Sequence, residues 1–506
     1  NGMESEPVIP KSFTKRLDHL GIIAALVAEL GIVDLVDARL PKLRHHTLTH
    51  GDVVLALILN GLGFTQRRLY LFASFFENKS LERIFRKDVT AADFTDDVIG
   101  RTLDAIKEYG PELLYQEIIS QIFITTQIGL HRVYLDTTNF SVHGAYNNNY
   151  DPDDPHPTIR VGKGYPKDGR WDLNRFGLGL IVNQIGVPLF MQLLSGNSDD
   201  KVALPEMLAR FRSQVEFPEP LHCIADSAFY TEHSLKKLDE KTFFITLVPG
   251  TVGEQQALLR QDLHLTPMTD PRYSYFETES WYGGVHQKWV MYHSTASHAK
   301  KEKALEKRRS KEDEKVKKAL VRLNNREFAC EADALTEAER WIRTYPYHEF
   351  ESVSVVTWQR RAPGLRGRPK KDEVTRTVYF LEAHVRPNEA AWKEEETALG
   401  RFVLATNDHN LSAEDLLAQY KNQGVVERGF RFLKDSSFAI SDIFLKKVGR
   451  IEALGMMMTL MLAVYSLGEH LLRERLAELG MTVPNQIGKP TAKPTFKWVM
   501  TFFDGV

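Results

Sequence analysis

Two aspartates, Asp136 and Asp226, each follow directly on a short apolar segment, His131–Leu135 and Leu221–Ala225. Such segments are typical of buried strands, and α/β folds build their active sites where side chains emerge at the carboxyl ends of strands. Two carboxylates that meet there can hold a hard divalent ion such as Mg²⁺, which prefers oxygen ligands. An aspartate at a strand end also caps a turn, and for each residue taken alone this structural role is favoured; the presence of two such aspartates, each followed by a hydroxyl residue, moves the balance toward a site.

A third carboxylate lies in a helix expected nearer the carboxyl terminus. Ser412 and Asp415 form a capping box, and the apolar spacing predicts one helix from there to about residue 434. Five polar side chains, spaced 3, 4, 4 and 3, fall on one stripe of that helix: Tyr420, Gln423, Glu427, Arg431 and Lys434. A solvated face is the usual meaning of such a stripe. A carboxylate among tyrosine, arginine and lysine also suits metal binding beside phosphate contacts, and the stripe favours a phosphate contact for the tyrosine over a nucleophilic role.

Composition excludes several classes of protein. The chain has 506 residues, 43% of them hydrophobic and 26% charged, which is typical of a globular protein of about three domains. Lys and Arg total 65 against 67 Asp and Glu, so a uniformly basic nucleic-acid coat is excluded but local basic surfaces are not. Two cysteines cannot form a disulfide framework, and together with the absence of a signal-peptide pattern they predict a cytoplasmic protein. The apolar run Ala453–Leu467 is shorter than the roughly 20 residues of a membrane span, so we expect a buried helix and no membrane partner.

The periodicity of the chain changes along its length and divides it into four segments. Residues 1–128 are helical in pattern, which suits an α-helical DNA-binding domain and suits a plain helical bundle equally well. Residues 129–250 alternate strands and helices in an α/β arrangement with a mixed sheet. Residues 251–400 contain alternating strands rich in Trp and Tyr and a charged helix, so we predict an insertion domain. Buried-strand character resumes at Arg401–Thr406, and residues 401–506 are expected to complete the core.

These motifs resemble those of the DDE transposases of bacterial insertion sequences. The branch concerned has the signature Tyr-x2-Arg-x3-Glu-x6-Lys, which reads here as Tyr420, Gln423, Glu427 and Lys434 in YKNQGVVERGFRFLKD, with glutamine in place of arginine. The segments YLDTTNFSVHG, LSGNSDDK and IADSAFYT around the two aspartates continue the resemblance, as does the loop GYPKDGRWDLN. The resemblance covers most of the chain from about residue 13 onward.

The resemblance implies a fold and a chemistry. The fold would be α/β, with an RNase H-like mixed-sheet core, a largely β insertion and an α-helical N-terminal domain. Asp136, Asp226 and Glu427 would hold two Mg²⁺ or Mn²⁺ ions, and the enzyme would cut a transposon end and join the freed 3′-hydroxyl to target DNA. The implied partners are double-stranded DNA, as terminal inverted repeats and as target, and a second copy of the chain in a synaptic homodimer associated with the bacterial nucleoid.

The resemblance also implies which residues contact DNA. On the helix and in the loop between the two aspartates they are Tyr420, Gln423, Arg428, Arg431, Lys434, Lys167 and Arg170. The insertion adds two basic segments. Residues 300–326 hold 12 Lys and Arg against 5 Asp and Glu, and Arg366 and Arg368 lie in RGRPKK, which resembles the minor-groove-binding core of an AT-hook. A solvated loop has the same composition.

Two other functions remain open on these residues. One is an RNase H-like DNA nuclease without strand transfer. The other is a domesticated DNA-binding protein whose carboxylates are relics, and the presence of all three carboxylates argues against it. A tryptophan of the insertion often stacks on a flipped base in this family when a hairpin end forms. Five tryptophans are candidates, and each also fits a core position: Trp281, Trp289, Trp341, Trp358 and Trp392.

Overall fold

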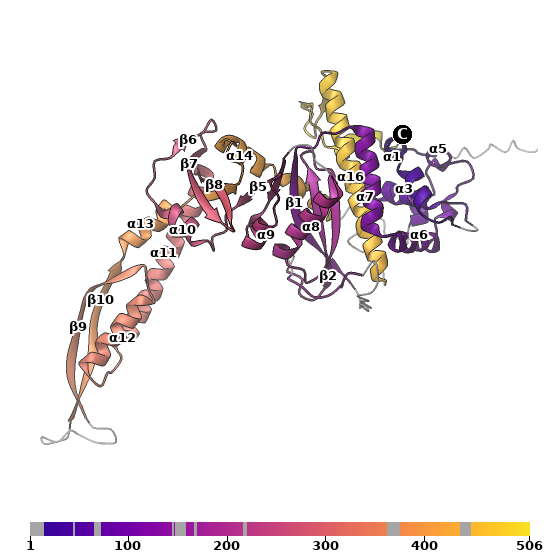
Figure 1. Ribbon diagram of the computed structural model, residues 1–506. Helices are drawn as coiled ribbons and strands as arrows, with labels where there is room; N and C mark the ends of the chain where they lie inside the picture. Colours follow the sequence, from indigo (N-terminus) through magenta and orange to yellow (C-terminus); the bar gives the residue numbers. More distant parts are fainter. Residues whose placement is uncertain are drawn as a thin grey trace, which may run out of the picture.

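The computed structural model describes residues 15–43, 46–64, 72–143, 146, 158–165, 169–215, 220–361, 375–435 and 447–505. Figure 1 shows a helical N-terminal part, a central sheet and an arm that projects away from the sheet. Helix α16 (Val448–Glu478) and the N-terminal helix α7 (Pro111–Thr126) both pack against the sheet, and the other N-terminal helices lie beyond them.

The N-terminal part is helical, as the sequence predicts. A capping box between Thr49 and Asp52 starts one of its helices, and Pro111 occupies the first position of another, where its missing N–H costs nothing. Its α-helices are α1 (Leu20–Glu29), α2 (Ile32–Arg39), α3 (His50–Leu62), α4 (Phe72–Phe76), α5 (Leu81–Ile84), α6 (Asp96–Tyr109) and α7 (Pro111–Thr126).

The described residues form one mixed sheet of nine strands in the order β3-β2-β1-β4-β5-β11-β8-β7-β6. Strands β1, β4 and β5 run parallel to one another, and β11 runs antiparallel to both β5 and β8. Strand β8 is therefore parallel to β5, and we call the edge at which β1, β4, β5 and β8 end the carboxyl edge. The strands are β1 (Arg132–Val142), β2 (Asn174–Asn183), β3 (Pro188–Ser195), β4 (Leu221–Ala225), β5 (Thr242–Leu247), β6 (Thr266–Pro267), β7 (Tyr273–Tyr282), β8 (Val285–Ser294) and β11 (Arg401–Thr406).

The expected α/β fold class is confirmed, but one predicted strand end is wrong. Strand β1 does not stop at Leu135; it continues to Val142. Its parallel pairing with β4 ends where Leu135 lies opposite Ala225, whereas its antiparallel pairing with β2 continues beyond Asp136. The strand persists because β2 still provides a hydrogen-bonding partner along one side.

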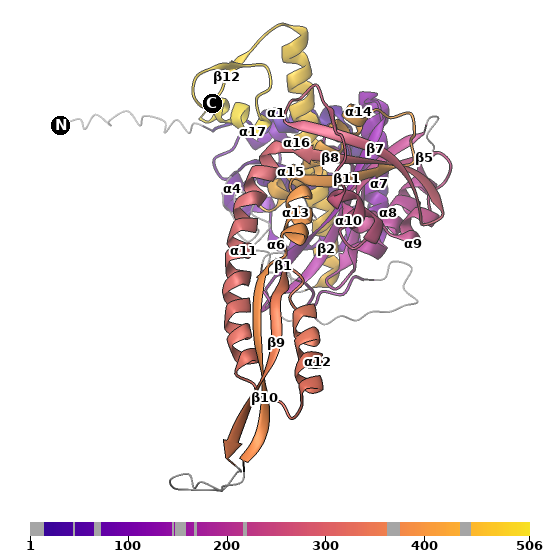
Figure 2. The same cartoon turned by 90° about the vertical axis from the view of Figure 1, so that its left-hand side faces the viewer.

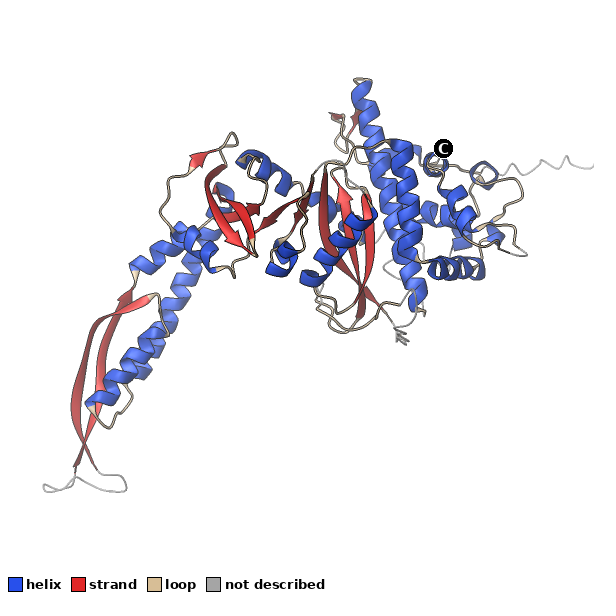
Figure 3. Ribbon diagram, in the orientation of Figure 1, coloured by secondary structure: helices blue, strands red, loops and turns tan. Residues whose placement is uncertain are grey.

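Residues 251–400 form two structurally different regions. Strands β6, β7 and β8 extend the central sheet through β11, whereas the arm lies apart from it (Figures 1 and 3). The arm consists of α11 (Thr295–Asn324), α12 (Glu331–Arg343) and a hairpin of β9 (His348–Arg361) and β10 (Thr375–Pro387). In Figure 2 the two arm helices flank the hairpin. The remaining elements are α8 (Asp200–Gln214), α9 (Glu232–Lys236), α10 (Gly253–Arg260), α13 (Glu389–Thr397), α14 (Ala413–Lys421), α15 (Gly424–Leu433), β12 (Val483–Pro484), β13 (Pro490–Thr491) and α17 (Phe496–Met500).

Helix α16 forms the centre of the largest apolar core. Its apolar run is long enough by length and composition to cross a membrane, yet most of it is buried inside the fold, as expected for a core helix. It packs against α1, α3, α6 and α7 on one side and against β3 and α15 on the other. Close packing is visible at Gly455, where a Cβ atom would come within 2.6 Å of Leu193 on β3. A single cluster of buried side chains therefore joins the N-terminal helices to the sheet.

We predict that the middle of α16 is essential for stability. Leu460 is fully buried, and Leu460→Ala should lower the free energy of unfolding by about 2–5 kcal/mol because it leaves a cavity. Leu479, which caps the same helix and is 53% exposed, provides the matched control; Leu479→Ala should change stability by less than about 0.5 kcal/mol. Urea denaturation followed by circular dichroism measures both. If the two variants lose the same free energy of unfolding, the central position of α16 is contradicted.

Candidate active site

Strand β1 presents Asp136 to the face of the sheet that α15 covers. Side chains of a strand alternate between faces, and Tyr134 and Phe140 belong to the apolar cluster beneath α15 and α16. Asp136 is an even number of residues from both, so its side chain points to the same face. Thr137, the next residue, points to the opposite face, where its hydroxyl donates to Asp200 at the start of α8. The backbone N–H of Thr137 donates to Asp136 Oδ1 at 2.7 Å.

Strand β4 brings Asp226 beside Asp136. Because Leu135 and Ala225 are register partners in parallel strands, the aspartates that follow them lie at the same level of the sheet. Asp226 also caps the short 3-10 helix Ser227–Phe229, since its Oδ1 accepts a hydrogen bond of 2.9 Å from the N–H of Ala228. The turn-capping role and the place beside a second carboxylate are therefore both present.

The third candidate carboxylate lies on a helix that is shorter than expected. The predicted single helix over residues 412–434 is wrong, since α14 ends at Lys421 and α15 begins at Gly424. Glycine has a low helix propensity, and Asn422 at the break donates from its side chain to the hydroxyl of Tyr134 at 3.0 Å. The five-residue stripe is divided accordingly. Tyr420 lies on α14, and the remaining members lie at the break, on α15 or just after it.

Two contacts fix how α15 lies on β1. Asn422, just before the helix, bonds to Tyr134, and the ammonium group of Lys434, just after the helix, lies 5.6 Å from the centre of the Phe140 ring. The start of α15 therefore lies beside Tyr134 and its end beside Phe140, six residues further along β1. Helix and strand run in the same direction, toward the carboxyl edge. Sequence reasoning missed Asn422 and Tyr134 as positioning residues. The asparagine stands within the YKNQG segment, but nothing in the sequence identifies its partner.

This alignment places Glu427 level with Asp136. Glu427 is five residues beyond Asn422, which is about 7.5 Å along a helix. Asp136 is two residues beyond Tyr134, which is about 6.7 Å along a strand. The carboxylate-bearing positions of α15 and β1 therefore occupy the same level, with α15 lying over that face of the sheet.

The pKa of Tyr420 reflects the negative charge of the same region. Burial and, to a smaller extent, the negative charges of Asp226 and Glu427 together raise the pKa of the Tyr420 phenol to about 12. A phenol with this pKa keeps its proton at neutral pH, so it can donate a hydrogen bond to an anion and is a poor nucleophile. The two carboxylates come from β4 and α15, and Tyr420 lies within electrostatic reach of both.

The donor set suits a hard divalent ion, but the site is not closed around one. Asp136, Asp226 and Glu427 offer carboxylate oxygens alone, which Mg²⁺ and Mn²⁺ prefer. Within the described ranges, no group of three His, Cys, Asp or Glu side chains is arranged to hold a metal ion. The three carboxylates thus share one region of the sheet without being gathered at ligating distance.

The expected DNA-contacting residues fall into three groups. Arg428, Arg431 and Lys434 are exposed on or just after α15, whereas Gln423 is buried at the helix break. Arg170 forms two hydrogen bonds with Asp172, of 2.8 and 2.7 Å, and holds the pKa of that carboxyl well below its usual range. The final group lies outside the described residues: Lys167, Arg366 and Arg368.

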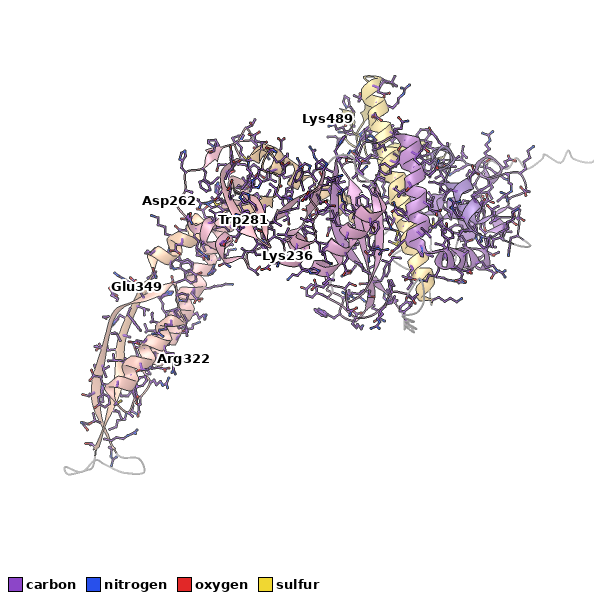
Figure 4. The ribbon with its side chains drawn as sticks, in the orientation of Figure 1. Lys236, Asp262, Trp281, Arg322, Glu349 and Lys489 are labelled. Atoms are coloured by element: carbon purple, nitrogen blue, oxygen red, sulfur yellow. The ribbon has the colours of Figure 1, made fainter. Side chains whose placement is uncertain are left out.

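The five candidate tryptophans are separated by burial. Trp289 and Trp392 are 2% and 1% exposed and belong to the core. Trp341 is half-buried in the arm, where it stacks on Phe350. Trp281, labelled in Figure 4, and Trp358 are largely exposed. Trp281 lies near the end of β7, which runs antiparallel to β8, and so stands away from the carboxyl edge.

Comparison with known families agrees with this arrangement. A family described as Transposase DDE domain matches residues 132–464, about two thirds of the chain, and this range contains all three candidate carboxylates. The chain belongs to the DDE transposase family. A second match, to a domain of unknown function (DUF4277), covers residues 12–120. No curated protein matches the chain.

Membership of the DDE transposases establishes the class of chemistry. The DDE transposase domain is a catalytic polynucleotidyl transferase fold, so the protein is an enzyme, and the domain implies DNA binding and DNA transposase activity. DDE transposases generally use divalent metal ions. The matched range begins with β1 and ends within α16, so it includes the first part of the central helix that the N-terminal part packs against.

We predict that the pKa of Tyr420 depends on its two acidic neighbours. Asp226→Asn removes one negative charge, so the phenolate becomes less unfavourable and the pKa should fall from about 12. Ultraviolet difference titration measures the change, with Tyr420→Phe identifying the signal. The exposed Glu478→Gln, at the far end of α16, is the control and should leave the pKa unchanged. The same pKa in wild type and Asp226→Asn would show that the two side chains are not coupled.

Proposed function

We propose that the protein is the transposase of a bacterial insertion sequence, from the branch with the Tyr-x2-Arg-x3-Glu-x6-Lys signature. It cuts the ends of its element and joins their 3′-hydroxyls to target DNA. The observation that carries the proposal is that Asp136, Asp226 and Glu427 lie in one region of the sheet, inside the matched transposase domain.

These three carboxylates would hold two Mg²⁺ or Mn²⁺ ions. Two such ions, when bound, activate the attacking oxygen and stabilise the leaving oxygen of an in-line phosphoryl displacement. The donor chemistry supports this assignment. Glu427 is exposed and forms no ion pair with any described residue, so its side chain can change rotamer at little cost.

The surrounding residues have separate tasks in this proposal. The bond from Thr137 to Asp200 holds β1 against α8 below the site. Tyr420 keeps its proton and donates to a phosphate oxygen. Arg428, Arg431 and Lys434 lie along the exposed side of α15 and would bind the phosphates of the strand being cut.

The proposal extends to assembly and location. Both ends of an element must be cut and joined together, so we propose a homodimer that holds the two ends in one synaptic complex. Its substrates are double-stranded DNA with terminal inverted repeats and a target duplex, and its place is the bacterial cytoplasm at the nucleoid.

A cleavage and joining assay tests the activity. The purified chain is mixed with Mg²⁺, duplexes that carry the flanking terminal repeats, and target DNA. Wild type should cut the ends and join them, whereas Asp226→Asn and Glu427→Gln should lower the cleavage rate by about 100-fold or more, since each removes a metal ligand. Glu478→Gln is the control and should retain the wild-type rate.

The other outcomes separate the alternatives. Cleavage without joining would favour the nuclease, and DNA binding without cleavage would favour the domesticated binding protein. Undiminished cleavage by Asp226→Asn or Glu427→Gln would contradict the assignment of the site.

Metal binding has a readout that does not require catalysis. Cations held by Asp226 and Glu427 would offset the charges that raise the pKa of Tyr420, so Mg²⁺ should lower this pKa in the wild-type protein. Glu427→Gln should weaken the response. A Tyr420 pKa that is insensitive to Mg²⁺ at millimolar concentrations would contradict metal binding at these carboxylates.

A further inference from the structure

Helix α11 of the arm carries a row of exposed cations. Its sequence TASHAKKEKALEKRRSKEDEKVKKALVRLN contains 11 Lys and Arg against 5 Asp and Glu. Five exposed cations are spaced 7, 4, 7 and 4 residues apart and fall within an arc of about 60°. We call them the α11 stripe: Lys300, Lys307, Lys311, Lys318 and Arg322.

The stripe faces away from the body of the arm. Val316 and Leu323 are the buried side chains of α11, and they lie about 140° around the helix from the centre of the stripe. Figure 4 shows Arg322 on the helical side of the arm and Glu349 on its strand side. The stripe therefore faces solvent along the arm.

The stripe cations differ from the neighbouring Arg308 and Arg309 in lacking acidic partners. Arg308 pairs with Glu395, and Arg309 pairs with Glu389, so these two arginines fasten α11 to α13. In the described chain, no member of the stripe forms an ion pair. Of the acidic residues of α11, Glu314 alone borders the stripe. The like charges repel one another along the helix, and a bound polyanion would relieve that repulsion.

The position of α11 connects the stripe to the candidate active site. Helix α11 begins at Thr295, directly after Ser294 ends β8, and β8 ends at the carboxyl edge together with β1 and β4. From there the helix runs outward along the arm (Figure 1). From Lys300 to Arg322 the stripe extends for about 33 Å. This is close to the roughly 34 Å of one turn of duplex DNA.

The chemistry of the stripe favours duplex DNA over other polyanions. No Phe, Tyr or Trp lies on α11, whereas single-strand binding surfaces use such rings to stack bases. The apolar side of the helix packs inside the arm, so it is not available to enter a membrane surface. Lysine and arginine side chains that contact phosphates do not read bases, so binding should be independent of sequence.

We propose that the α11 stripe binds the phosphate backbone of duplex DNA over about one helical turn, on the DNA that extends from the carboxyl edge of the sheet. The inference rests on the proposed function, because it gives that site a path for the duplex on which it acts. The stripe serves as a binding surface, and its residues take no part in phosphoryl transfer.

Salt-dependent binding tests the stripe separately from catalysis. The full chain is titrated with a duplex of random sequence in the absence of divalent metal. The titration is repeated at salt concentrations from about 50 to about 300 mM. Lys311→Gln/Lys318→Gln should lower the slope of log affinity against log salt by about 2, and should weaken binding at about 0.1 M salt by roughly tenfold or more. The matched control is Lys489→Gln/Lys493→Gln, which removes the same charge from two exposed lysines outside the arm (Lys489, Figure 4).

Each outcome decides the inference. A fall in duplex affinity and in salt slope that is confined to the stripe variant supports the inference, whether or not the protein later cleaves DNA. Equal slopes for wild type and the stripe variant would overturn it, as would equal losses in the stripe and control variants. If the stripe variant loses as much affinity for a single strand of the same length as for the duplex, the assignment to duplex DNA is overturned as well. Circular dichroism should show unchanged helix content, since all four lysines are exposed.

Discussion

The burial of α16 is the interaction on which the rest of the structure depends. Residues 453–464 of α16 are buried all round the helix, so this part must be covered on every side, and no single layer of this protein can do that. The N-terminal helices cover one side, and the sheet with α15 covers the other. The same helix thus ends the matched transposase domain and supports the region that precedes it. It also supports α15, and through α15 the level at which Glu427 lies.

Hydrogen bonds and ion pairs of charged side chains supplement this apolar packing at the start of α16. Arg450 near the start of α16 forms two hydrogen bonds of 2.7 Å with Asp104 of α6. Buried Glu452, two residues further on, pairs with Lys107 at 2.7 Å and accepts a hydrogen bond of 2.8 Å from the backbone N–H of Ile159. Burial raises the pKa of Glu452 despite these partners. Residues 158–165, which include Ile159, are therefore tied to the N-terminal helices as well as to the sheet.

The distribution of charge explains why overall composition conceals a nucleic-acid enzyme. The formal net charge is −2, but charge is locally unbalanced in the arm and on α15. Paired arginines fasten α11 to α13, whereas the cations of the α11 stripe have no acidic partner among the described residues. A polyanion responds to the field of a local surface within about 10 Å at moderate salt, so the net charge of the chain is a poor guide to binding.

The sequence by itself determined the elements with strong local signals. The buried strand before Asp226, the charged helix α11 and the apolar helix α16 all follow from periodicity, which depends on neighbours along the chain. It also identified the acidic motifs of the transposase family. Only the tertiary structure decided that β1 continues past Asp136, because that depends on pairing with β2, and that the helix breaks beside Asn422, whose partner Tyr134 is distant in the chain. It likewise decided that β6, β7 and β8 join the central sheet and that α11 starts at its carboxyl edge. These features arise from contacts between residues far apart in sequence, and local spacing carries no information about such contacts.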